Sequence, residues 1–106
     1  MISDKDWKLL KNNLPNWQER YMERLVNEYI DLLSDKEKYA SEKFWTLSKK
    51  INNDKKKYGI QVSLSRSNVE YILIELLNEK VITMEDLSCF SAELKDNINK
   101  MIDTKI

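Results

Sequence analysis

The sequence predicts an all-α fold: a compact bundle of five to six helices in a single domain, residues 1–106, with one extended connector near residues 60–64. One Gly and one Pro in 106 residues leave few of the residues that β-hairpin turns require. Apolar residues recur at intervals of three and four along several stretches, as they do on one face of a helix. Most of these stretches follow a Ser or Thr, which can cap the N-terminus of a helix.

The first predicted helix runs from Asp4 to about Lys11. Ser3 can cap it, and Trp7 and Leu10 would face inward. The stretch Asn12–Leu14 is expected to break this helix just before Pro15.

A second helix is predicted from Pro15 to Leu33, because proline suits the first helical position, where its missing N–H would be unpaired anyway. Apolar residues cover about half of its circumference or more. They are Trp17, Tyr21, Met22, Leu25, Val26, Tyr29, Ile30, Leu32 and Leu33. A surface helix needs a narrower stripe, so this helix is either central to the fold or shared with a partner.

A third helix is predicted from Glu42 to about Lys57, with Ser41 as its cap. Its inward stripe is narrow and consists of Phe44, Leu47 and Ile51. Trp45 lies off this stripe, so it either packs inside the fold or is exposed and anchors an interface. Gly59 follows in the position where a left-handed residue closes a helix.

The segment 60–64 alternates apolar and polar residues but has no obvious partner strand. We therefore expect a connector that docks Ile60, Val62 and Leu64 on the core. A fourth helix, capped by Ser65 or Ser67, should end near Glu79, with a core face formed by Val69, Ile72, Leu73, Leu76 and Leu77. Tyr71 and Ile74 lie on its far side and, with Trp45, are candidate interface residues.

Two further helices complete the prediction. Thr83 and Asp86 form a pattern that predicts the cap of a short helix, which passes through Met84, Leu87 and Phe90. Ser91 then caps a last helix, from Ala92 to about Thr104. Its inward residues are Leu94, Ile98, Met101 and Ile102.

The composition argues against catalysis. General acid–base chemistry most often uses His, and the sequence has none. The one cysteine, Cys89, is interpreted as a small packing residue, and without His it cannot complete an ordinary zinc, haem or iron–sulfur site. We therefore expect no metal, no cofactor and no enzymatic activity. A carboxylate enzyme would need two or more of Glu85, Asp86, Glu93 and Asp96 to converge in a pocket.

The net charge is zero, but the charges are unevenly placed. Residues 43–57 hold six Lys and one Asp, whereas residues 70–103 hold eight acidic residues and three Lys. The basic stretch is either a patch for nucleic acid or another anionic partner, or simply a solvated helix face. No apolar run approaches the roughly 20 residues of a membrane helix. The first residues lack the apolar region of a signal peptide, so we expect a cytoplasmic protein.

The segment Ser65–Val69, with the apolar pairs 72–73, 76–77 and 81–82, resembles the recognition helix of helix-turn-helix regulators. That resemblance implies DNA contacts from Arg66, Ser67, Asn68 and Tyr71, supported by Lys55, Lys56 and Lys57. The simpler interpretation is that Ser and Asn are good helix starters. As a whole, chiefly in residues 17–33 and 65–90, the chain is similar to short all-helical proteins of low-GC Gram-positive bacteria and their phages, which implies no particular function.

The leading hypothesis is a small cytoplasmic bacterial protein that acts as a protein–protein interaction or adaptor and regulatory module. The broad apolar faces of two helices and the off-stripe Trp45 support it. Its partner would be another protein or a second copy, since a homodimer is a simple way to bury such faces. The alternative is a helix-turn-helix DNA-binding regulator.

Overall fold

The computed structural model describes residues 2–104, which contain helices and loops and no strand. The all-α class is therefore confirmed. We expected five to six helices, but the described residues form four α-helices and two short 3₁₀ helices, Arg66–Asn68 and Met84–Leu87. The four helices are α1 (Asp4–Leu33), α2 (Ala40–Asp54), α3 (Val69–Asn78) and α4 (Ala92–Thr104).

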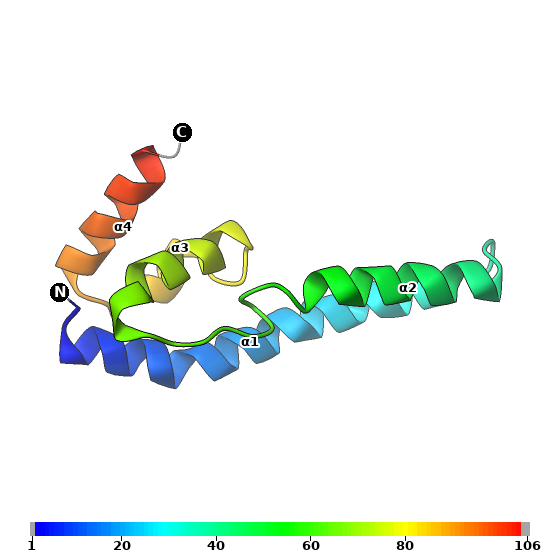
Figure 1. Cartoon of the computed structure of the whole chain (residues 1–106), viewed down its shortest axis with the longest axis horizontal. Helices are drawn as coiled ribbons and strands as arrows, with labels where there is room; N and C mark the ends of the chain where they lie inside the picture. Colours follow the sequence, from blue (N-terminus) through cyan, green and yellow to red (C-terminus); the bar gives the residue numbers. More distant parts are fainter. Residues whose placement is uncertain (1, 105–106) are drawn as a thin grey trace.

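The molecule has a globular end and a long projection rather than the expected compact bundle. Figure 1 shows α3 over the first half of α1 and α4 rising away from the start of α1, while the second half of α1 pairs with α2 and extends away from them. The radius of gyration is 16.8 Å, whereas a compact domain of this length would have about 13 Å. We call the globular end the head.

The predicted break before Pro15 is absent, and α1 continues through it. Pro15 is exposed, and beside it the Asn13 Nδ2 donates a hydrogen bond to the Leu9 carbonyl at 2.7 Å. The buried apolar side chains of α1 follow one another at intervals of three or four on both sides of the proline. They are Leu10, Leu14, Trp17, Tyr21 and Leu25. Burying each such side chain contributes about 1.5–3 kcal/mol, which together outweighs the roughly 3 kcal/mol that an internal proline costs.

The core lies where α3 meets α1, α4 and the loop between α3 and α4. From α3 it takes Val69, Ile72, Leu73, Ile74 and Leu76, and from the rest of the C-terminal half Val81, Ile82, Leu87, Phe90, Leu94 and Ile98. Ile74 was expected on an outer face, but none of its surface is exposed. The short α3 is enclosed on more than one side, so Ile74 cannot belong to an interface in this conformation.

The extended connector is confirmed. Residues 61–65 are neither helix nor strand, and Ile60, Val62 and Leu64 are partly buried against the core. The connector crosses from the end of α2 to the start of α3 along α1 (Figure 1).

Gly59 precedes this connector and differs from the prediction, because its φ is not positive. Its backbone is buried against α1 instead: a Cβ built there would lie 2.3 Å from the Tyr21 Cδ2 and 2.7 Å from the Val81 Cγ2. Glycine is thus required for close packing rather than for backbone conformation.

The residue with a positive φ is Lys80, at 60°. It closes α3, where the Val81 N–H donates to the Leu76 carbonyl at 2.9 Å and the Lys80 N–H donates to the Leu77 carbonyl at 3.1 Å. These two bonds are the pattern of a helix that ends in a left-handed residue.

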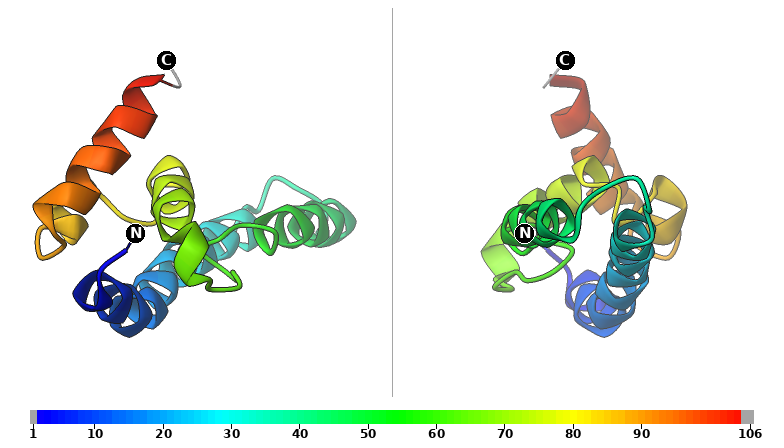
Figure 2. Two further views of the ribbon diagram at one scale, coloured as in Figure 1. Left: turned by 60° about the vertical axis from the view of Figure 1, so that its left-hand side comes forward. Right: turned by 90° about the vertical axis from the view of Figure 1, so that its right-hand side faces the viewer.

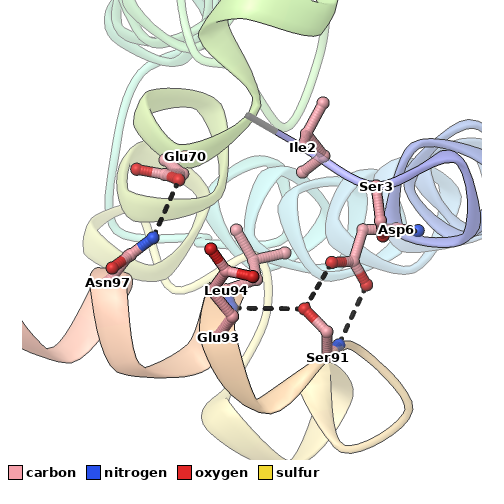
Figure 3. Close-up of a pocket in the computed structure, with 8 residues that line it drawn as sticks. All are labelled: Ile2, Ser3, Asp6, Glu70, Ser91, Glu93, Leu94 and Asn97. Atoms are coloured by element: carbon pink, nitrogen blue, oxygen red, sulfur yellow. Dashed lines mark hydrogen bonds between the residues drawn. The ribbon is translucent and has the colours of Figure 1, made fainter.

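Asp6 joins the start of α1 to the start of α4 (Figure 3). Its carboxylate is 2% exposed and accepts hydrogen bonds from the Ser91 N–H at 2.9 Å and the Ser91 hydroxyl at 2.6 Å. The same Ser91 oxygen accepts from the Leu94 N–H at 3.2 Å, which confirms Ser91 as the cap of α4. The Ser3 cap is also confirmed, since its hydroxyl accepts from the Asp6 N–H at 3.1 Å.

The prediction for residues 83–90 is partly correct. The Thr83 N–H donates to the Asp86 carboxylate at 2.8 Å, as a capping pair should, and a short helix follows, but it is a 3₁₀ helix that ends at Leu87, before Phe90. Cys89 lies beyond this short helix and is exposed, so it is not the packing residue that was expected.

Replacing Gly59 by Ala should destabilise the fold by about 1–3 kcal/mol, because the added methyl group must displace the Tyr21 ring and the Val81 side chain. Urea denaturation followed by circular dichroism measures this. The exposed connector substitution Ser63→Ala should change stability by less than about 0.5 kcal/mol. Equal stability of the two variants would contradict the close packing.

Asp6→Asn should lower the thermal midpoint by about 5 °C or more, because the amide nitrogen cannot accept the second hydrogen bond from Ser91 and a buried donor loses its partner. The exposed substitution Asp96→Asn is the matched control. If both variants melt together with the unmodified chain, the Asp6–Ser91 contact does not hold α4 in place.

Candidate functional site

Two arginines near the middle of α1 tie that helix to the head. The Arg20 guanidinium contacts the Asp86 carboxylate at 3.0 Å and donates to the Val81 carbonyl at 3.2 Å. Arg24 donates to the Lys80 carbonyl. Burial raises the pKa of Asp86, but the Thr83 N–H and the Arg20 guanidinium more than offset this, so the pKa lies below its ordinary value. These bonds fix the direction in which α1 leaves the head.

The segment that follows α2 is also held against the head, next to the contacts of the two arginines. The Glu79 carboxylate accepts hydrogen bonds from the Tyr58 and Gly59 N–H groups, both at 3.1 Å. The Gln18 Nε2 donates to the Tyr58 carbonyl at 3.0 Å. The chain that returns from α2 is therefore anchored to both α1 and α3.

Beyond this junction, residues 22–55 form a helical hairpin that we call the arm. Figures 1 and 2 show that no other element lies against its outer half. Leu25 is the one buried residue of the arm, and α2 has none. The arm is thus two helices that cover each other only along one edge.

Most of the exposed large apolar side chains belong to the arm. Within residues 2–104, nine such side chains are exposed, and seven of them lie between residues 26 and 51. They are Val26, Ile30, Leu33, Tyr39, Phe44, Trp45 and Ile51. Single exposed apolar residues are normal, but a contiguous apolar surface marks an interaction site.

The structure corrects the prediction for α2. This helix begins at Ala40 without a side-chain cap from Ser41, and it ends at Asp54 rather than near Lys57. Phe44 and Ile51, which were expected to face inward, are exposed. The reason is the shape of the fold: the head lies at one end of α1, so α2 has only α1 to pack against.

One side-chain hydrogen bond joins the two arm helices in the described part of the chain. The Tyr29 hydroxyl donates to the Asp54 carboxylate at 2.5 Å. Burial and the neighbouring Asp54 carboxylate raise the pKa of Tyr29, so the hydroxyl stays protonated and remains a donor. This bond sets the register of α2 on α1.

Two shallow grooves follow the arm on one face. The first, of about 230 Å³, lies between the helices and is lined by Met22, Leu25, Val26, Tyr29, Ile51, Asp54, Lys55 and Ile60. The second, of about 250 Å³, is lined by Phe44, Leu47, Ser48, Ile51 and Asn52. Because Ile51 lines both, the grooves form one surface, which we call the apolar face.

Trp45 stands at the border of this face and is 67% exposed. Its ring packs edge-on against that of Phe44, with centroids 5.0 Å apart and planes at 87°. This edge-to-face arrangement is favourable for two aromatic rings. Of the two interpretations of Trp45, the structure favours the exposed one.

The remaining candidate residues do not join this face. Tyr71 is half-exposed on α3, with its ring 6.2 Å from that of Tyr58. Arg66 contacts the Asp4 carboxylate at 2.5 Å and donates to the Ile2 carbonyl at 3.1 Å.

The other residues named for DNA contact are split between two places. The Ser67 hydroxyl contacts that of Ser65 at 2.9 Å, so neither serine makes the predicted cap, and Asn68 precedes α3 as its N-cap residue. The cluster Lys55–Lys57 is exposed at the inner end of α2, separated from the start of α3 by the connector.

The four carboxylates proposed for catalysis have other surroundings. Asp86 is held by Arg20 and Thr83, whereas Glu85, Glu93 and Asp96 are exposed.

The described residues contain no group of three or more acidic or sulfur side chains able to hold a metal ion. Among residues 2–104, no helix combines the length and apolar composition needed to cross a membrane.

No protein-family model matches the chain, and no curated protein or solved structure shows significant similarity to it.

Proposed function

We propose that this protein is a protein–protein interaction module, of adaptor or regulatory type and without enzymatic activity, that binds its partner through the apolar face of the arm. The observation that carries the proposal is the concentration of seven of the nine exposed large apolar side chains on residues 26–51. A hydrophobic surface of this kind is stabilised when a partner removes it from water.

The size of the surface supports this proposal. Tyr39, Phe44 and Trp45 are 63–77% exposed. At about 150–250 Å² per aromatic side chain, the three leave on the order of 300–500 Å² of surface in water. This exposed aromatic area is comparable with that of the largest apolar patch of a typical monomer, which is roughly 300–600 Å². The four aliphatic residues of the arm add to it.

A photo-reactive phenylalanine analogue in place of Trp45 tests the proposal in cells that produce the chain naturally. We expect covalent adducts with a defined protein, which includes other copies of the chain, after illumination. The same analogue at Met84, an apolar head residue that is 40% exposed, is the matched control and should give none. Absence of adducts at Trp45, or identical adducts at both positions, would contradict a binding role for the arm.

Trp45→Ser should leave the fold intact but weaken the complex. The side chain is mostly in water, so its loss should change unfolding by less than about 0.5 kcal/mol. Removal of an aromatic anchor from an interface costs about 2 kcal/mol or more, a roughly 30-fold loss of affinity. Isothermal titration or sedimentation with the captured partner measures this change. Unchanged affinity would show that the partner binds elsewhere.

The alternative remains a helix-turn-helix DNA-binding regulator, and the exposure of Lys55, Lys56 and Lys57 is the observation in its favour. It predicts binding to duplex DNA that weakens by a factor of about 10³ or more between 50 and 200 mM salt. Under the interaction proposal we expect no DNA binding at about 50 mM salt in an electrophoretic shift assay. A shift that Arg66→Ala and reversal of the three lysines abolish would favour the alternative.

A further inference from the structure

We infer that the partner on the apolar face is a second copy of this chain, and that the two arms pair side by side in the same direction, with α1 of each copy against α2 of the other. This inference rests on the proposed function and names its partner. The spacing of the apolar residues, the charges at the two edges of the face, and its area support it.

The spacing on both arm helices suits a four-helix bundle. On α1, Met22, Val26, Tyr29 and Leu33 follow one another at intervals of four, three and four. On α2, Phe44, Leu47 and Ile51 continue the pattern at intervals of three and four. Side chains in such rows interdigitate with those of helices that cross at about 20°, as in four-helix bundles. The arm supplies two of the four helices, and a second arm supplies the other two.

The two edges of the apolar face carry opposite charge near the head. Glu19 and Glu23 precede Met22 and Val26 by three residues, which places them beside that row on the side away from buried Leu25. Both are exposed, and neither has an ion pair in the described part of the chain. The neighbouring arginines, Arg20 and Arg24, turn toward the head and do not neutralise this edge.

The edge formed by α2 is basic at the same level. Lys55 lines the first groove together with Met22 and Val26, and the exposed Lys56 follows it. A rotation of 180° about the length of the arm places the α1 edge of one copy on the α2 edge of the other. Glu19 and Glu23 of each copy then face Lys55 and Lys56 of the other copy, so the two-fold axis creates two equivalent contacts between opposite charges. A net charge of zero leaves no overall repulsion between copies.

The area agrees with this occupant. A standard specific interface buries roughly 800 Å² on each partner. The three exposed aromatic residues and the four aliphatic ones of the arm together approach this value, so one arm is sufficient to cover another.

Analytical ultracentrifugation of the full chain tests the inference. We expect a mass twice the chain mass of 12.7 kDa at micromolar concentration. The double variant Glu19→Lys, Glu23→Lys should raise the dimer dissociation constant at least tenfold, and so should Lys55→Glu, Lys56→Glu. An equimolar mixture of these two variants should recover wild-type affinity, because each contact between the two different chains again pairs opposite charges.

The control and the contrary outcomes separate the inference from the proposed function. Glu85→Lys with Asp96→Lys reverses two exposed acidic residues of the head and should leave dimerisation unchanged. A dimer whose two arm variants do not recover on mixing would overturn the parallel pairing. A wild-type chain that stays monomeric up to about 100 μM would overturn self-association, whereas adducts of the Trp45 analogue with a different protein would still uphold the interaction module.

Discussion

The structure depends on α1 being one helix through Pro15. At about 1.5 Å per residue, its 30 residues make a rod about 45 Å long, which is most of the 52 Å length of the molecule. The first part of that rod carries the base of the core, and the last part carries half of the arm. A break at the proline would separate Leu10 and Leu14 from the helix that carries the arm. Only contacts beyond the proline, such as those of Trp17, Gln18 and Arg20, would then set the direction of the arm relative to the head.

The continuity of α1 could have been read from the sequence, because Leu10, Leu14 and Trp17 keep helical spacing across the proline. The local rule that proline begins a helix indicates the opposite, and the packing of these side chains prevails over it. The capping rule was correct at some positions and wrong at others. Ser3, Ser91 and the Thr83–Asp86 pair occupy the capping positions that their sequence pattern indicates, whereas α2 and α3 begin without a side-chain cap from the serines near their starts. A serine caps a helix only at the residue where the helix begins, and α2 begins at Ala40, before Ser41.

Other features depend on contacts between distant segments, and the sequence alone could not give them. The side chains of Phe44 and Ile51 have the spacing of core residues, but whether they are covered depends on where the head lies. Ile74 is the reverse case, since the 81–90 loop and α4 close over α3 from its outer side. Gly59 and Lys80 also could not be predicted from local sequence. Glycine is needed at position 59 because Tyr21 packs against it, and the left-handed backbone position is taken by Lys80 instead of the glycine. The sequence did indicate that Trp45 was a candidate interface residue and that the helix at residues 15–33 had a broader apolar surface than a surface helix needs. It did not indicate that this helix and the helix that carries Trp45 form one apolar face.

Because α1 belongs to both the core and the arm, a partner bound to the arm would also stabilise the head. The arm has one buried residue and one hydrogen bond between its helices in the described range, so by itself it is weakly held. Anything that binds the folded arm and not the unfolded chain lowers the free energy of the folded state by mass action. The hydrogen bonds of Arg20, Gln18 and Glu79 hold both α1 and the segment after α2 against the core. Through these bonds, a lower free energy of the folded arm also favours the folded head. Order in the arm and stability of the head are therefore coupled through a single helix.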